Sequence, residues 1–268
     1  MGNAYIIGDT FSTDFPLQNP FQANHHANPH CQLCRDVFVS KLNETGEALV
    51  YSTYLGGGRT KNGIAIVVDI EGHAYVTGET HSSDFPIVNP FQSAPTGSSD
   101  AFVAKFNHDT DTLLYSIFRG SSEQDRGHAI AVDAKGHAYV IDHTLSASFP
   151  EVNTLMDQPS GCEIIVQVQF NTFVIKLDPT GSTLSYSLCL GHGVGRATAV
   201  NASGLVVIAG YTCSPTFPQV NPIQVAFGRA VRCFCRAGRY HRLQFTFLQL
   251  SCRRKTRHGF KYCSGFRG

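Results

Sequence analysis

The sequence predicts an all-β fold of β-propeller type, made of repeated units that each contain four short antiparallel strands. The first observation behind this prediction is a repeated string, which is most complete at residues 72–90. Its glycines at positions 2, 72, 136 and 204 are 70, 64 and 68 residues apart, and the Phe-Pro pairs that follow them keep the same spacings. A fixed period of this kind indicates one structural unit that is used several times.

The second observation is the pattern inside one unit. Strand-like runs cover residues 63–69, 73–78, 101–106 and 113–118, and turn-forming Asp, Asn, Gly and Pro residues separate them. The third observation is that no convincing run has the 3.6-residue period of a helix. Four antiparallel strands at a period of about 65 residues are typical of a propeller blade, whereas a solenoid repeats at about 20 to 45 residues.

The units follow one another along residues 1–228, with boundaries near 2–62, 63–126, 127–194 and 195–228. The first unit supplies only strands two to four, and the fourth supplies only strands one and two. The chain therefore predicts an incomplete ring of about three and a quarter blades, whereas closed propellers have at least about four. We expect a fragment of a longer protein, or closure through self-association of the open blade faces.

Residues 229–268 depart from the repeat. They hold 11 of the 21 Lys and Arg residues, no Asp or Glu and four of the nine cysteines, so their net charge of +11 contrasts with −10 for residues 1–228. One interpretation is a basic tail that binds nucleic acid or an anionic membrane surface. We favour the other, a frameshifted or unstructured tail, because the period predicts a third strand here and basic arms are typically rich in Lys, Ser and Gly. No nucleic-acid partner is therefore expected.

The composition predicts a protein with an apolar core and without a membrane-spanning helix. The 268 residues are 42% hydrophobic and 15% charged, which is enough apolar material for a core. No apolar run reaches the 18 residues or so of a membrane-spanning helix, and no signal peptide is visible at the N-terminus.

Three blocks of sequence carry a resemblance to a known family. Residues 51–57 (Y-S-T-Y-L-G-G), residues 63–86 and residues 100–107 resemble the motifs of the bacterial SBBP β-propeller repeat family. The resemblance extends from residue 2 to about residue 227. It implies an exported or cell-surface protein with a binding or scaffolding surface, and it brings no common set of catalytic residues.

Two loops contain candidate metal ligands. Cys31 and Cys34 form a Cys-x2-Cys pair, and His25 and His30 could complete a tetrahedral zinc site. Because no second pair follows, we favour a polar surface loop whose cysteines are free or paired in an oxidising compartment. Calcium could be held by the Ser82-Ser83-Asp84 loop and its copies, although a loop-capping role is favoured there.

The residues that recur with the repeat are expected to be structural, since an active site would break the repeat symmetry. Hairpin turns explain the pairs Asp69 and Gly72, Asp133 and Gly136, and Asn201 and Gly204. No G-x-S-x-G, H-E-x-x-H or phosphate-binding glycine motif is present.

The sequence thus favours a non-catalytic module that binds an unknown protein or glycan, with the ligand on the long Phe-Pro loops at one end of the blades. One alternative is a carbohydrate-active lyase or hydrolase, because propellers also host enzymes. That alternative needs a symmetry-breaking cluster of carboxylates, His or Tyr, and the sequence shows none that is convincing. Another alternative is the non-functional product of a frameshifted gene.

Overall fold

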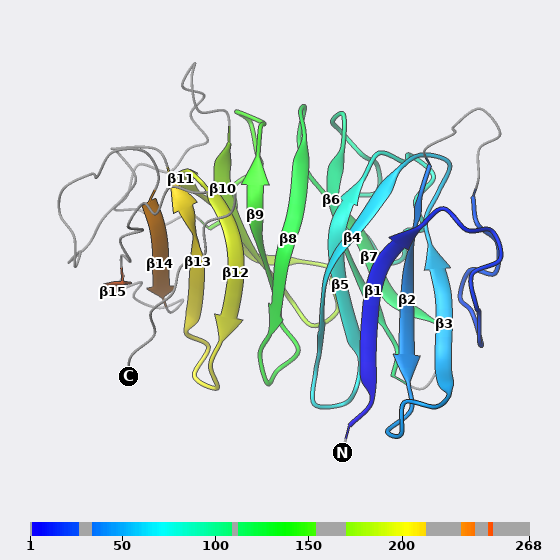
Figure 1. Ribbon diagram of the computed structural model, residues 1–268. Helices are drawn as coiled ribbons and strands as arrows, with labels where there is room; N and C mark the ends of the chain where they lie inside the picture. Colours follow the sequence, from blue (N-terminus) through cyan, green and yellow to red (C-terminus); the bar gives the residue numbers. More distant parts are fainter. Residues whose placement is uncertain are drawn as a thin grey trace, which may run out of the picture.

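The computed structural model describes residues 2–26, 34–108, 112–153, 170–212, 232–238 and 246–248. In this part of the chain all regular secondary structure is β-strand, and the strands form four antiparallel sheets (Figure 1). Among these residues there is no helix with the length and apolar character needed to cross a bilayer. The prediction of an all-β fold made of four-stranded antiparallel units is therefore confirmed.

Each sheet is a meander in which every strand pairs with the next one along the chain. The first sheet contains β1 (Ala4–Thr10), β2 (Asp36–Leu42) and β3 (Leu49–Leu55). The second contains β4 (Lys61–Val68), β5 (Ala74–Thr80), β6 (Asp100–Phe106) and β7 (Leu113–Arg119). The third contains β8 (Asp125–Val132), β9 (Ala138–Thr144), β10 (Asn171–Leu177) and β11 (Leu184–His192), and the fourth β12 (Val194–Val200), β13 (Val206–Thr212), β14 (Arg232–Gly238) and β15 (Thr246–Leu248).

The sheets stand side by side in sequence order, so that β4 packs against β1, β8 against β4, and β12 against β8 (Figure 1). Strands of the middle sheets are buried on both faces. On β5, for example, Tyr75 joins the apolar core shared with the third sheet, whereas Val76 joins the core shared with the first. This explains why β5, β6 and β9 are buried throughout instead of alternating.

Two strands lie in the segment 229–268, which we expected to be unstructured or out of frame. β14 pairs with β13 from Thr212↔Arg232 to Val206↔Gly238, and β15 pairs with β14. They occupy the third and fourth places of a blade. The structure thus has two strands more than the sequence predicted. β14 forms hydrogen bonds with the edge of β13, whose backbone N–H and C=O groups would otherwise be unpaired.

The Phe-Pro loops have a structural role in the described part of the chain. Phe85 and Phe149 are buried in the cores, and each loop forms a bridge to the outer strand of its own sheet: Gln18 to Ser52, Val88 to Ser116 and Val152 to Ser187. Asn19, Asn89 and Asn153 have positive φ angles of 42°, 49° and 51°, and each side-chain amide donates to a carbonyl of that outer strand. These loops therefore cover the outer edges of the sheets.

Candidate functional site

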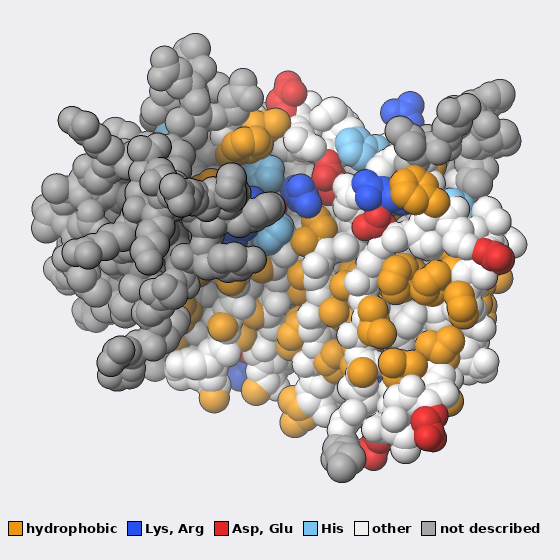
Figure 2. Space-filling view, in the orientation of Figure 1, with side chains coloured by type: hydrophobic (Ala, Val, Ile, Leu, Met, Phe, Trp, Pro, Cys, Tyr) orange, Lys and Arg blue, Asp and Glu red, His pale blue; other side chains and the backbone are white. Residues whose placement is uncertain are grey.

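One end of the sheets collects the side chains that break the repeat. Because neighbouring strands are antiparallel, β5, β9 and β13 end where β4, β8 and β12, respectively, begin. Figure 2 shows that Lys, Arg, His and acidic side chains gather at this end of the visible face, whereas apolar side chains cover the strands below. The hairpin turns lie at the opposite end.

Asp142 and His143 form the buried part of this group. Asp142, on β9, is fully buried, and its Oδ1 lies 2.8 Å from His143 Nδ1. Its Oδ2 has no hydrogen-bond partner and lies 3.9 Å from His128 Nδ1 on β8. His143 packs edge-on against Phe170, with 4.5 Å between the ring centroids. The carboxylate therefore fixes one imidazole and faces a second.

Arg196 and Tyr211 extend the group towards solvent. Arg196, on β12, is exposed, and its guanidinium lies 3.3 Å from His128 Nδ1. It also donates to the Tyr211 hydroxyl at 3.3 Å and lies 5.4 Å from the centre of that ring. Burial, together with the charges of Arg196 and Arg126, lowers the pKa of His128. A neutral His128 can accept a hydrogen bond from the guanidinium.

Glu79 is the second buried acid of this region. Its Oε1 accepts hydrogen bonds from Ser99 Oγ and Gln124 Nε2, both at 2.7 Å. Although burial alone would raise it, the pKa of Glu79 is held at about 2 by hydrogen bonds from His81, Gln124 and Ser99. In turn, Glu79 raises the pKa of His81, whose Nε2 lies 3.3 Å from Oε1. Arg126 Nε lies 4.0 Å from Glu79 Oε2.

These residues lie in one region and are called here the polar end cluster. Its members are Glu79, His81, Arg126, His128, Asp142, His143, Arg196 and Tyr211. The acids are buried, and the more accessible groups are basic or aromatic. The cluster can therefore hold a ligand through several donors whose positions the buried carboxylates fix.

Sequence reasoning missed this cluster, although one signal was present. Asp142 pairs with Phe173 and with Gly127, as Gly78 pairs with Phe102 and with Gly63. A Cβ at Gly78 would lie 1.9 Å from the Asn62 carbonyl oxygen, so this place in the repeat favours glycine. An aspartate at a place where the other units have glycine is the kind of local departure that marks a functional position.

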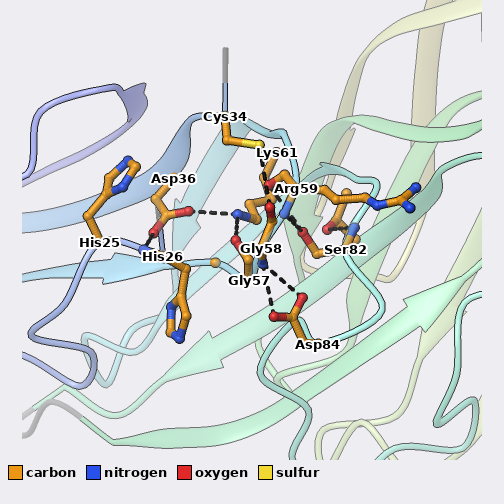
Figure 3. Close-up of polar contacts among 12 residues, drawn as sticks. His25, His26, Cys34, Asp36, Gly57, Gly58, Arg59, Lys61, Ser82 and Asp84 are labelled. Atoms are coloured by element: carbon orange, nitrogen blue, oxygen red, sulfur yellow. Dashed lines mark hydrogen bonds and ion pairs between the residues drawn. The ribbon is translucent and has the colours of Figure 1, made fainter. Parts of the chain in front are cut away.

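The junction between the first and second sheets contains the predicted calcium loop (Figure 3). Lys61 Nζ lies 2.7 Å from Asp36 Oδ1, both side chains are fully buried, and the ammonium also donates to the Gly57 carbonyl. Ser82 Oγ accepts the Arg59 N–H at 2.9 Å. The loop is held across the junction by these contacts.

The same loop ends at Asp84, whose two carboxylate oxygens accept the Gly58 N–H at 2.8 and 3.0 Å. The oxygens expected as possible calcium ligands thus cap backbone N–H groups of the neighbouring unit. This is the loop-capping alternative.

The zinc candidates are only partly described. His25 and Cys34 lie in the described part of the chain, whereas His30 and Cys31 lie outside it. His25 Nε2 lies 3.2 Å from the Thr10 carbonyl oxygen. Cys34 is disulfide-bonded, which corresponds to the paired-cysteine alternative, and a disulfide sulfur is not the thiolate that zinc requires.

The turn residues hold the opposite end of the sheets. Gly72, Gly136 and Gly204 have φ angles of 86°, 82° and 77°, a region that favours glycine. Asn201 Oδ1 accepts backbone N–H groups within its own turn, and Asp69 and Asp133 do the same. The turns also connect neighbouring units, because Tyr5 donates to the Gly72 carbonyl at 3.0 Å and Tyr75 to the Gly136 carbonyl at 3.3 Å.

Within the described ranges, one group of three side chains has metal-ligand types in close proximity: Asp69, Glu71 and His73. Asp69 already accepts hydrogen bonds from two backbone N–H groups and from Tyr75, and it contacts His73 Nδ1 at 3.0 Å. Its repeat equivalent Asp133 makes the same contacts with His137 and Tyr139. This group is therefore part of the turn.

Comparison with known proteins agrees with this architecture. Residues 50–86 match the model of the SBBP β-propeller repeat. The matched segment begins within β3, crosses the first junction, contains β4 and β5, and ends at the Phe-Pro pair. No curated protein matches the chain. The chain thus carries an SBBP β-propeller repeat within an all-β fold of antiparallel four-stranded sheets.

Proposed function

We propose that this protein is a non-catalytic binding module of an exported or cell-surface protein, and that its polar end cluster binds an acidic glycan. The observation that carries the proposal is the placement of accessible cationic side chains over buried acids. Arg196 is exposed, and the side chains of Arg126 and His81 are each 34% exposed, whereas those of Glu79 and Asp142 are 4% and 0% exposed.

The charge arrangement selects the ligand class. Each buried acid contacts a histidine: Glu79 contacts His81, and Asp142 contacts His143. The acids therefore orient these imidazoles, and the accessible surface is rich in N–H donors. Arginine is well suited to bind a carboxylate with two parallel hydrogen bonds. A uronate-containing chain supplies such carboxylates at regular intervals.

Tyr211 and Arg196 add a flat surface to these charges, because the guanidinium lies over the ring. Aromatic rings with a polar group at one end are common at binding surfaces, since they offer apolar area together with a hydrogen bond. This favours a glycan over a small inorganic anion.

The exported context is supported by the cysteines. Cys34 and Cys189 each take part in a disulfide bond, and disulfides persist mainly in oxidising compartments. The SBBP resemblance carries the same expectation.

Binding is tested by isothermal titration of the full chain with polyuronate oligosaccharides at low and at moderate salt. We expect Arg196→Ala to weaken binding at least tenfold, which corresponds to about 1.4 kcal/mol. Lys135→Ala is the matched control, because Lys135 is exposed on a hairpin turn at the opposite end of the third sheet. Equal binding by both variants would contradict the proposal, and so would wild-type protein that binds an acidic peptide but no glycan.

One observation favours a second candidate, a carbohydrate-active lyase or hydrolase. Asp142 holds His143 at 2.8 Å, and a carboxylate-oriented imidazole can act as a general base. Incubation of the protein with the same polyuronates, followed by measurement of new reducing ends and of unsaturated products, separates the two functions. Turnover that Asp142→Asn abolishes would replace our proposal with this one.

A further inference from the structure

The junctions between consecutive sheets can be compared position by position, because each uses the same backbone hydrogen bond. The first residue of the incoming unit donates to the residue before the third strand of the preceding one: Lys61 to Arg35, Asp125 to Ser99 and Gly193 to Phe170. The residues that follow these acceptors are Asp36, Asp100 and Asn171. The three junctions therefore contain the pairs Asp36–Lys61, Asp100–Asp125 and Asn171–Gly193.

The formal charge of these pairs differs at one junction. The aspartate and lysine of the first junction cancel, and the asparagine and glycine of the third are neutral. The second junction contains two carboxylates, and the Asp100 and Asp125 residues are both 0% exposed. Burying two like charges is strongly unfavourable unless cations balance them.

The geometry around the two carboxylates matches that of the lysine junction. A Cβ on Gly56 would lie 2.4 Å from Asp36 Oδ1 and 3.1 Å from Lys61 Cδ. At the equivalent Gly120, a Cβ would lie 1.8 Å from Asp100 Oδ1 and 2.8 Å from Asp125 Oδ2. Both carboxylates thus lie against Gly120, the repeat equivalent of the Gly56 that faces the Lys61 side chain in the first junction.

The hydrogen bonds leave one side of these carboxylates open. Asp125 Oδ2 accepts from the Ser121 N–H at 2.6 Å and from Ser146 Oγ at 3.2 Å, whereas Asp125 Oδ1 has no hydrogen-bond partner. Asp100 Oδ2 accepts the Thr96 N–H at 2.7 Å, and its Oδ1 has a long contact of 3.4 Å to Thr96 Oγ1. The Gly97 N–H also donates to this carboxyl group. Asp125 Oδ1 is therefore the oxygen of this pair that is left without a hydrogen bond in a fully buried place.

The nearest cation is Arg119, whose charge interacts with that of Asp125: burial lowers the pKa of Arg119 and Asp125 partly offsets this. The hydrogen bonds of its guanidinium go to other residues. Arg119 is 4% exposed, donates to the Pro150 carbonyl and to Ser187 Oγ at 2.7 Å, and lies over the Phe149 ring. These contacts direct its guanidinium to the Phe-Pro loop of the third unit. Gln92, which faces Gly120, uses its Oε1 to accept the Gly120 N–H at 3.3 Å.

We propose that the second junction is a cation site, in which Asp100 and Asp125 bind Ca²⁺ at the place that the Lys61 ammonium takes in the first junction. The carbonyl of Ser121 is the repeat equivalent of the Gly57 carbonyl that accepts from Lys61, so it is a third oxygen ligand. All three are hard oxygen donors, which Ca²⁺ prefers, and water completes its coordination. This site shares no ligand with the polar end cluster, although it adjoins that cluster through Ser99 and Gln124, which both donate to Glu79. The proposal does not depend on the glycan proposal.

The test uses the full chain after treatment with a chelator. Equilibrium dialysis against Ca²⁺ with metal analysis gives the stoichiometry, and thermal unfolding with and without Ca²⁺ gives the linked stabilisation. We expect one Ca²⁺ per chain for the wild type. Asp125→Lys, which installs the residue of the first junction, should bind none, and its melting temperature should no longer respond to Ca²⁺.

Asp84→Asn is the matched control, because Asp84 belongs to the Ser-Ser-Asp loop and caps a backbone N–H. It should bind Ca²⁺ as the wild type does. Should Asp125→Lys fail to fold, Asp125→Asn keeps the test open, and it should weaken Ca²⁺ binding about tenfold or more because one ligand charge is lost. Three results would overturn the proposal: wild-type protein that binds no Ca²⁺, unchanged binding in the Asp125 variants, or loss of binding in Asp84→Asn.

Discussion

Replacement of Lys61 by methionine tests the first junction, where a buried ion pair connects two sheets. Lys61 Nζ and Asp36 Oδ1 are 2.7 Å apart, and both side chains are fully buried. Methionine keeps the length and apolar stem of the lysine but removes its charge. Asp36 then retains the His26 N–H at 2.9 Å and the Gln22 amide at 3.4 Å, and no cation.

The expected loss follows from leaving a buried carboxylate without its partner, which costs about 3–5 kcal/mol in the free energy of unfolding. The double variant Lys61→Met/Asp36→Asn removes both charges and approaches the neutral pair of the third junction. We expect it to recover most of the loss and to lie within about 1–2 kcal/mol of the wild type.

Urea unfolding followed by circular dichroism measures both variants, with Lys135→Met as a control at an exposed turn. The reasoning would be refuted by a Lys61→Met variant that loses less than about 1 kcal/mol, the typical value of a surface ion pair. A double variant no more stable than the single one would also contradict it, since the loss would then arise from lost packing.

Three further predictions follow from the described contacts. Burial, with Asp100 nearby, raises the pKa of Asp125 to about 6. The carboxyl group of Asp125 therefore binds a proton more tightly in the folded state than in the unfolded state. In the presence of a chelator, the free energy of unfolding should fall by about 2–3 kcal/mol as pH rises from about 4 to about 7. Asp125→Asn should reduce this pH dependence in urea titrations and leave the part that is due to Asp100, whose pKa burial also raises. Tyr75→Phe should lower the free energy of unfolding by about 1–2 kcal/mol, because the hydroxyl donates to Asp69 and to the Gly136 carbonyl; an unchanged midpoint would contradict this. Gly136→Ala should cost about 1–2 kcal/mol, since φ is 82° there, whereas Gly2→Ala, with nothing within 4 Å, should be neutral.

The periodic sequence predicted most of the fold, because the repeat appears directly in the residues. Runs of β-branched residues end at Asp-x-x-Gly turns, and Asp69 and Gly72 make the contacts that such a turn requires. The Phe-Pro pair predicted a loop, but not that its phenylalanine enters the core or that it covers the outer strand. Those contacts depend on where the chain goes after the pair, which local sequence does not determine.

The junctions and the polar end cluster could not be predicted, because they are formed by residues from different units. Lys61 meets Asp36 across two sheets, and nothing in the spacing of the two residues indicates it. Asp142 could have been noticed as a departure from glycine, but its neighbours His128 and Arg196 come from β8 and β12. Segment 229–268 shows the same limit, because its strand β14 follows from the unpaired edge of β13 and not from its composition.

The central claim is that the departure from the repeat at Asp142 creates the binding site. It is tested most directly by titration of polyuronate oligosaccharides into the wild type and into Asp142→Gly, which restores the residue that Gly78 provides in the second unit. We predict a folded variant with the wild-type circular dichroism spectrum and no measurable glycan binding, because His143 loses the carboxylate 2.8 Å away that orients it. Binding of equal affinity by the wild type and Asp142→Gly would contradict the claim.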